Sequence, residues 1–146
     1  MIAADSTYPS TQVFPRQEST LAAPRGRWQG AANSPVAYRR DSLGQIRELR
    51  IGAWRVLAAT ETRRIADVRE LSAGRTAVLI ERRGVPSGPV TSLLWQLYDG
   101  AGRLLSAMQS SPDGQRTLMM NYQTRQACQV NVNDAGTLET VGEWFF

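Results

Sequence analysis

Histidine and lysine are absent from this chain of 146 residues, and cysteine occurs only once. Without histidine there is no side chain with an ordinary pKa of about 6.5, no Ser–His or Cys–His dyad and no imidazole ligand for zinc. Without lysine there is no Schiff-base nucleophile and no Walker-type phosphate lysine. The single Cys128 excludes an internal disulfide and any site built from several cysteines. These absences therefore exclude catalysis that depends on imidazole, on lysine or on a multi-cysteine metal site.

Paired carboxylates remain as one route, because an Asp or Glu whose pKa is raised by burial can take part in cleaving a glycosidic bond. The candidates Glu81, Asp99, Glu139 and Glu143 are scattered along the chain, and Asp99 already has an explanation as a turn residue. We therefore do not expect an enzyme. The sequence predicts no catalytic residue, no cofactor and no metal site.

Long apolar runs are also missing. No segment approaches the roughly 18 to 20 residues that a helix needs to cross a bilayer, so we expect no transmembrane helix. All 17 basic residues are arginines, and the net charge is +4. A codon bias and a selection against amine modification both explain the absence of lysine. Several arginines have a carboxylate close by, as in Arg39-Arg40-Asp41, so we expect a surface of mixed charge and not a basic stripe.

Residues 1–24 differ in composition from the rest of the chain. They contain Pro9, Pro15 and Pro24 among Ser, Thr, Gln and Ala, and they show no helical or strand-like apolar period. We predict a flexible tail here and one folded domain over residues 25–146. The first ten residues lack the basic and apolar regions of a Sec signal peptide, which leaves open a cytoplasmic protein, an exported protein without a visible Sec signal, and a form from which a signal peptide was removed.

Four turns divide the domain into apolar or alternating segments. Each has a short polar side chain that can bond to its own backbone and a glycine that supplies a positive φ. The turns are Asp41-Ser-Leu-Gly44, Asp99-Gly-Ala-Gly102, Pro112-Asp113-Gly114 and Asn133-Asp134-Ala-Gly136. The segments that they separate predict strands over 91–98, 104–109, 117–124, 128–132 and 138–146. This pattern predicts a mainly β fold, an antiparallel meander of hairpins that forms a curved sheet or a small barrel.

The segment 60–72 has a different spacing. Ile65, Val68 and Leu71 are spaced three residues apart. This spacing favours a helix near 60–72 and an α+β variant of the fold. The alternative is a polar strand that pairs with residues 76–82 across a tight turn.

The predicted core contains the largest apolar side chains at inward strand positions. It consists of Trp28, Trp95, Leu97, Val130, Val132 and Trp144. Cys128 alternates with the same inward set, so we interpret it as a packing residue.

Two short stretches resemble known families. Gly26-Arg27-Trp28 resembles the Gly-x-Trp that opens the first strand of lipocalin-type barrels. That resemblance implies a small barrel with an apolar ligand, although the family's frequent disulfide cannot form here and no ligand residue carries over. Tyr98-Asp99-Gly-Ala-Gly102-Arg103-Leu104 is similar to the core of the YD repeats of large bacterial toxin shells. Residues 38–46 are similar to the same core in fewer positions, and the two stretches define no fixed repeat period.

The sequence predicts a non-catalytic binding or interaction module whose partner is another protein or a small apolar ligand. Binding of nucleic acid by stacking on aromatic and arginine side chains is possible in principle, but the modest charge does not favour it. The candidate ligand or partner residues are Tyr38, Arg39, Arg40, Trp54, Arg55, Tyr122 and Arg125. A second hypothesis is a translocated effector, since the Ser/Thr/Pro/Gln-rich start resembles type III secretion signals, although Asp5 departs from their pattern. An enclosed apolar cavity favours the small ligand, and a filled core favours the effector or protein-interaction hypothesis.

Overall fold

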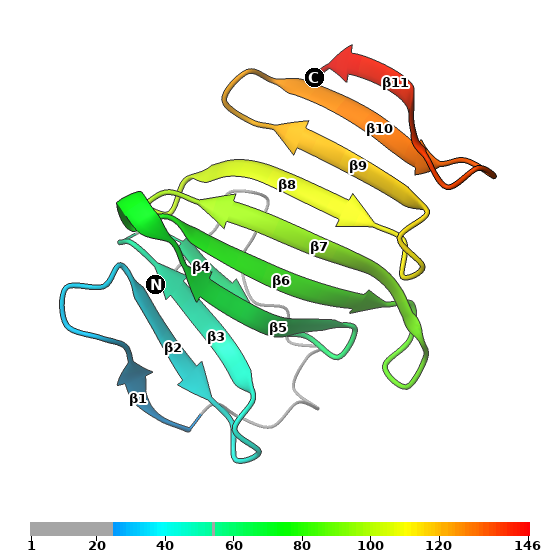
Figure 1. Ribbon diagram of the computed structural model, residues 1–146. Helices are drawn as coiled ribbons and strands as arrows, with labels where there is room; N and C mark the ends of the chain where they lie inside the picture. Colours follow the sequence, from blue (N-terminus) through cyan, green and yellow to red (C-terminus); the bar gives the residue numbers. More distant parts are fainter. Residues whose placement is uncertain (1–24, 54) are drawn as a thin grey trace.

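The computed structural model describes residues 25–53 and 55–146. Within these residues the regular structure is β-strand, apart from one 3-10 turn, η2 (Ser72–Gly74), so the mainly β prediction is confirmed (Figure 1). No helix in this part of the chain has the length and apolarity needed to cross a membrane. The predicted tail over residues 1–24 and the candidate residue Trp54 lie outside the described residues.

The strands form two antiparallel sheets in which each strand pairs with the next. The first sheet contains β1 (Arg25–Gln29), β2 (Val36–Arg40), β3 (Ile46–Ile51) and β4 (Arg55–Ala58). The second contains β5 (Arg63–Glu70), β6 (Thr76–Arg83), β7 (Val90–Tyr98), β8 (Leu104–Ser110), β9 (Arg116–Asn121), β10 (Gln126–Val132) and β11 (Leu138–Phe145). The predicted hairpin meander is confirmed, and β7 to β11 lie where the sequence placed them.

Neither sheet closes on itself within the described part of the chain. In the seven-stranded sheet β5 and β11 are the two edges, and no hydrogen bonds join them. The structure is therefore the curved sheet of the prediction and not the small lipocalin-like barrel.

The helix predicted near residues 60–72 is wrong, and the alternative strand is the observed structure. Residues 63–70 form β5, which pairs antiparallel with β6 from Arg63↔Arg82 to Glu70↔Thr76. A bulge between Ile65 and Asp67 shifts the register, so that Ile65 lies opposite Ile80 and Val68 lies opposite Val78. Two apolar residues three apart thus point to the same face of a strand. The bulge produced the helix-like spacing in the sequence.

Three of the predicted turns use one hydrogen-bonding pattern. In the β2–β3 turn, Oδ1 of Asp41 accepts hydrogen bonds from the backbone N–H groups of Leu43 and Gln45 at 2.9 and 3.0 Å. The β7–β8 turn repeats this pattern around Asp99, and the β10–β11 turn repeats it around Asn133. The last glycine of each turn has φ between +81° and +88°, a region that glycine enters without steric cost. These loops are therefore fixed by local chemistry.

The buried core lies between the two sheets. It consists of Val36, Leu49, Ile51, Ala59, Ile65, Val78, Ile80 and Tyr98. The predicted core is wrong at its largest members. Trp28 and Trp95 are half-buried, and Trp144 is 44% exposed. Leu97, Val130 and Val132 are also only half-buried. Most of these residues lie on a face or a part of the seven-stranded sheet that none of the described strands of the first sheet covers.

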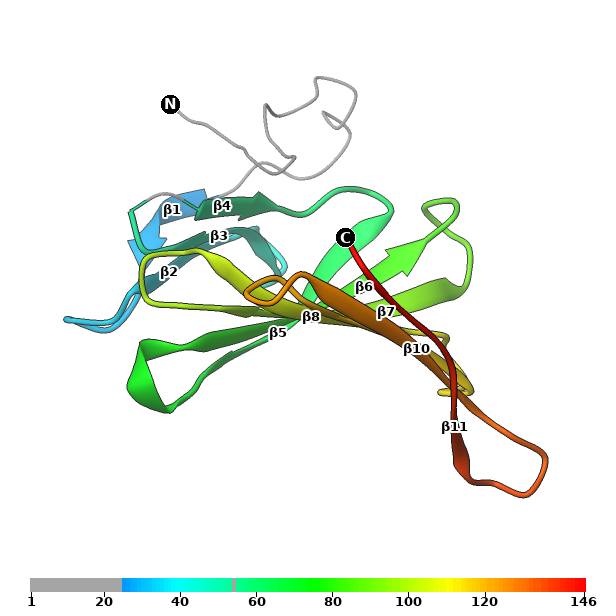
Figure 2. The ribbon, with the colours of Figure 1, turned by 90° about the horizontal axis from the view of Figure 1, so that it is seen from above.

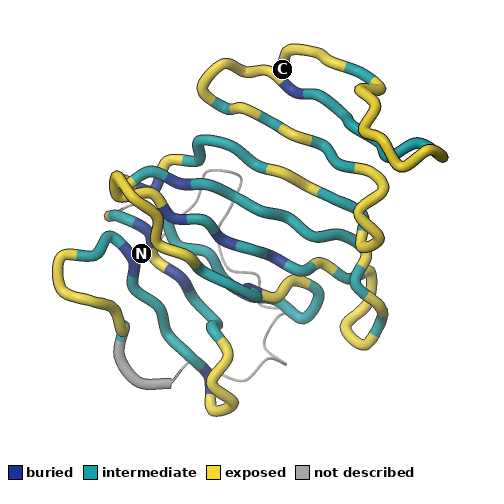
Figure 3. The backbone as a smooth tube through the Cα atoms, in the orientation of Figure 1, coloured by how far each residue is buried: buried dark blue, intermediate teal, exposed yellow. Residues whose placement is uncertain are grey.

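The molecule has a two-layer part and a one-layer part. The four-stranded sheet packs beside β5–β7, whereas β8–β11 extend beyond it (Figures 1 and 2). Buried residues follow this division, since they gather on β2, β3 and β5–β7 and become sparse from β8 onward (Figure 3). In β8–β11 Ala127 is the one buried apolar residue among those described.

The backbones of the two sheets come into close contact at two turn glycines, Gly52 and Gly102. A Cβ on Gly102 would lie 2.3 Å from the carbonyl oxygen of Ile51, and a Cβ on Gly52 would lie 2.5 Å from the backbone of Ala101. The β3–β4 and β7–β8 turns therefore pack backbone against backbone. Nε of Arg55 also donates a hydrogen bond to the carbonyl oxygen of Gly102 at 3.3 Å.

Candidate functional site

The strand register aligns apolar side chains across one face of the seven-stranded sheet. Trp95 on β7 lies opposite Met108 on β8, which lies opposite Met119 on β9. Met119 lies opposite Cys128 on β10, which lies opposite Glu143 on β11. Because residues directly opposite each other share a face, these five side chains form one row across five strands.

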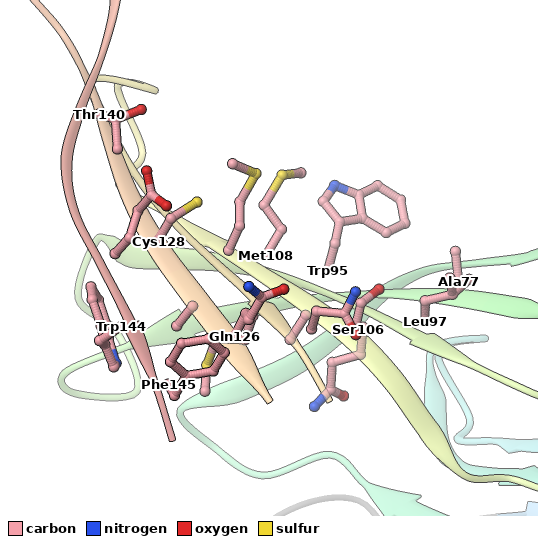
Figure 4. Close-up of a pocket in the computed structure, with 17 residues that line it drawn as sticks. Ala77, Trp95, Leu97, Ser106, Met108, Gln126, Cys128, Thr140, Trp144 and Phe145 are labelled. Atoms are coloured by element: carbon pink, nitrogen blue, oxygen red, sulfur yellow. The ribbon is translucent and has the colours of Figure 1, made fainter. Parts of the chain in front are cut away.

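A groove follows this row, with a volume of about 810 Å³. A second row, two residues away along each strand, supplies more of its floor from Leu97, Ser106, Asn121, Gln126 and Phe145. Trp95, Met108, Cys128 and Thr140 project from the same side of the strands (Figure 4). The groove is thus a surface feature of the sheet and not an interior cavity of a barrel.

The groove is apolar and open to solvent. Met108 is 40% exposed, Met119 is 39% exposed and Phe145 is 74% exposed. At the β5 end the guanidinium of Arg69 stacks over the Trp95 ring at 5.6 Å, and its Nε forms an ion pair with Asp67 at 2.8 Å. The groove is therefore an accessible face on which large apolar side chains gather.

The candidate residues on β2 form a cluster on the first sheet, away from the groove. The guanidinium of Arg40 lies 5.0 Å from the ring centre of Tyr38, and NH1 of Arg39 forms an ion pair with Glu48 at 3.1 Å. Arg39 and Arg50 also stack over the Trp28 ring at 5.7 and 4.9 Å. These arginines are engaged with aromatic rings of the protein itself, which leaves less ring surface for stacking with nucleotides.

The other candidates lie at two further places. Arg55, at the start of β4, contacts the β7–β8 turn and stacks over the Tyr98 ring at 5.5 Å. Tyr122 and Arg125 lie in the β9–β10 turn and hold the last residue, Phe146, through an edge-to-face ring contact and a cation–π contact. The seven predicted residues therefore do not converge on one site. Whether any of them binds a ligand stays a prediction.

The candidate carboxylates do not converge either. Glu81 forms ion pairs with Arg64 and Arg83, and only Glu143 of the four lines the groove. Burial alone would raise the pKa of Asp99, but hydrogen bonds from the backbone and side chain of Arg103 and from Ala101 outweigh it and lower that pKa. A carboxylate with a lowered pKa is a poor general acid at neutral pH.

The pKa of Asp41, which is buried, is lowered for the same reasons as that of Asp99. Burial would raise its pKa, but backbone hydrogen bonds from Gln45 and Leu43 and the Arg47 guanidinium together lower the pKa below its ordinary value of 3.8. The Arg47 Nε lies 2.6 Å from Oδ2 of Asp41. In the part of the chain that is described, no group of three His, Cys, Asp or Glu side chains is placed to hold a metal ion.

The groove is not among the predicted sites. The sequence predicts Trp95 as a core residue and Cys128 as an inward packing residue. The alternation of β10 did place Cys128 and Val130 on one face, and the strand register confirms this. The missing information was whether a second layer covers that face, and no local pattern carries it.

Comparisons with known families, with curated proteins and with solved structures found no match to this chain.

Proposed function

We propose that this chain is a non-catalytic protein-interaction module that docks a protein partner on the groove of β7–β11. The observation that carries the proposal is the row Trp95, Met108 and Met119, whose two methionines are exposed, on the face of the sheet opposite to the one on which the first sheet packs. Covering such a surface removes apolar area from water, which is the main driving force of association. Methionine also suits this task, because its flexible thioether adapts to different partner surfaces.

The shape of the groove favours a protein over a small molecule. Small-molecule sites bury roughly 70–90% of the ligand in a cleft or cavity. Here the apolar residues lie on a sheet face whose methionines are already about two-fifths exposed before anything binds. A small ligand on such a face keeps much of its own surface in water, whereas a protein covers the whole face.

Site-specific photo-crosslinking in cells tests this proposal. A benzoylphenylalanine in place of Met108 should give a discrete adduct with one protein, identified from the cross-linked peptide by mass spectrometry. Adding Met119→Glu should abolish the adduct, because it places a charge at the centre of the groove. The matched control is Gln109→Glu, which adds the same charge to an exposed neighbour on the other face of β8 and should leave the adduct unchanged.

Two outcomes would contradict the proposal. An adduct that survives Met119→Glu, or that forms equally from a crosslinker in place of Gln109, would show that the groove is not the contact surface. Stoichiometric binding of oleate, measured by quenching of tryptophan fluorescence and lost in Met119→Glu, would instead assign the groove to a small apolar ligand.

A further inference from the structure

The outer edge of β11 is an unpaired sheet edge. Its inner edge pairs with β10 from Gln126↔Phe145 to Val132↔Leu138, and no strand of the described residues pairs with its outer edge. At the opposite end of the sheet β5 contacts β3 of the other sheet, whereas β11 is the outermost of the described strands in Figure 1. An exposed strand of eight residues presents backbone donors and acceptors that can pair with another chain.

The charge of this edge is opposite to that of the whole protein. All 17 arginines lie at or before Arg125, whereas residues 126–146 contain three carboxylates and no basic residue. Two of these carboxylates, Glu139 and Glu143, are exposed on β11 itself. Neither forms an ion pair with any residue in the described part of the chain. The edge therefore offers two unneutralised negative charges.

A bulge sets the two charges on opposite faces of the sheet. Glu143 lies opposite Cys128 and Glu139 lies opposite Asn131, so the four-residue step along β11 corresponds to a three-residue step along β10. Cys128 and Asn131 point to opposite faces, because side chains alternate along a strand. Glu143 thus lines the groove, whereas Glu139 lies on the other side.

We propose that β11 binds an extended basic segment of another protein chain as an added antiparallel or parallel strand. A regular strand beside β11 must present its cations on opposite faces, so the segment should carry Arg or Lys at positions i and i+3. Apolar residues of the same segment would cover Trp144 and Phe145, which are 44% and 74% exposed. This inference rests on the proposed interaction function and names the chemistry of its partner.

A second copy of this chain is a poorer occupant of the same edge. Two β11 strands side by side gather four carboxylates at one joint, and β11 carries no cation to neutralise them. Like charges opposite each other destabilise strand pairing, whereas opposite charges stabilise it. The two glutamates therefore oppose self-pairing and favour a basic partner.

Two labelled peptides of identical composition test the spacing with the full chain. Ser-Val-Arg-Val-Thr-Arg-Val-Ser carries its arginines at i and i+3, and Ser-Arg-Val-Arg-Val-Thr-Val-Ser carries them at i and i+2 on one face. We expect the first to bind about threefold more tightly in fluorescence anisotropy, since it makes one more cross-strand charge pair. The first peptide with alternate backbone nitrogens methylated should not bind, because it cannot form the ladder of hydrogen bonds.

Matched variants locate the site. The double variant Glu139→Gln, Glu143→Gln should bind both peptides equally and weakly, whereas Asp134→Asn should keep the threefold preference. Asp134 is exposed in the β10–β11 turn, so its replacement removes a charge near the edge without touching the strand. The groove variant Met119→Glu, which lies two strands away, should also keep the preference, so a failure of the groove proposal is distinguishable from a failure of this one.

Three results would overturn the inference. Equal affinity for both peptides and for the methylated one would show non-specific attraction of cations. Absence of measurable binding by the wild-type chain would exclude a strand-binding edge. A dimer in sedimentation velocity that is lost when β11 is blocked by Val141→Pro would make a second copy the occupant.

Discussion

The two-layer part and the one-layer part of this protein are built from the same hairpins, yet only one of them buries its side chains. Leu49 and Val78 lie between the sheets and are fully buried, whereas Met119 and Trp144, on similar strands, remain largely accessible. The turn at Asp41 in the first part and the turn at Asn133 in the second have the same pattern of hydrogen bonds. Local turn chemistry therefore forms the hairpins in both parts, whereas burial of side chains requires a second layer.

The largest expected difference concerns side-chain truncation. Leu49→Ala should lower the free energy of unfolding by about 2–5 kcal/mol, because it leaves a cavity in a fully buried core. Met119→Ala should cost less than about 1 kcal/mol, because its side chain already contacts water. Urea denaturation of both variants measures the two values. Equal losses would show that the face of β9 is packed in solution and would remove the groove.

The turn glycines give the next comparison. Gly102 and Gly136 have φ of +88° and +82°, but a Cβ on Gly102 would lie 2.3 Å from a backbone oxygen, whereas a Cβ on Gly136 meets nothing within 4 Å. Gly136→Ala should therefore cost about 1 kcal/mol for its left-handed backbone. Gly102→Ala should cost roughly 1–3 kcal/mol more, since the two sheets must move apart. Thermal unfolding of the pair tests this, and similar melting temperatures would mean that the joint between the sheets is loose.

A smaller effect is expected at the turn acids, and it depends on pH. Asp41→Asn keeps the oxygen that accepts the turn hydrogen bonds, as Asn133 does, but loses the charge paired with Arg47. We expect a loss of about 1–3 kcal/mol at pH 7. The reverse change, Asn133→Asp, lies in an exposed turn of the one-layer part and should alter stability by less than about 0.5 kcal/mol.

The sign of the pH dependence follows from the lowered pKa of Asp41. A carboxyl with a lower pKa in the folded state than its ordinary 3.8 contributes stability above that value and loses it as the pH falls through the folded pKa. The difference between wild type and Asp41→Asn should therefore be constant near neutral pH and shrink below about pH 4. Denaturation at pH 7, 4 and 3 measures it, and a gap that grows in acid would contradict the role given to Arg47.

Much of the fold could be predicted because its signals are local. The Asp-x-x-Gly and Asn-x-x-Gly turns, the alternation of β10 and the absence of histidine and lysine are all properties of a few neighbouring residues. The one element that was wrong, at residues 63–70, failed because a bulge places Ile65 and Val68 on one face of a strand. A bulge depends on pairing with a partner strand, so the spacing alone resembled a helix.

The candidate site could be predicted only in part, and the reason is coverage. The pattern of apolar residues predicts that strands such as β7 and β10 have apolar faces, and the absence of histidine and lysine excludes imidazole and lysine chemistry from any site on them. The tertiary structure adds that the first sheet packs on the core face of β5–β7, and that Trp95, Met108 and Met119 lie on the opposite face beside an acidic edge. Alternation identifies an apolar face from neighbouring residues, whereas the layer that covers or exposes it comes from segments far away along the chain.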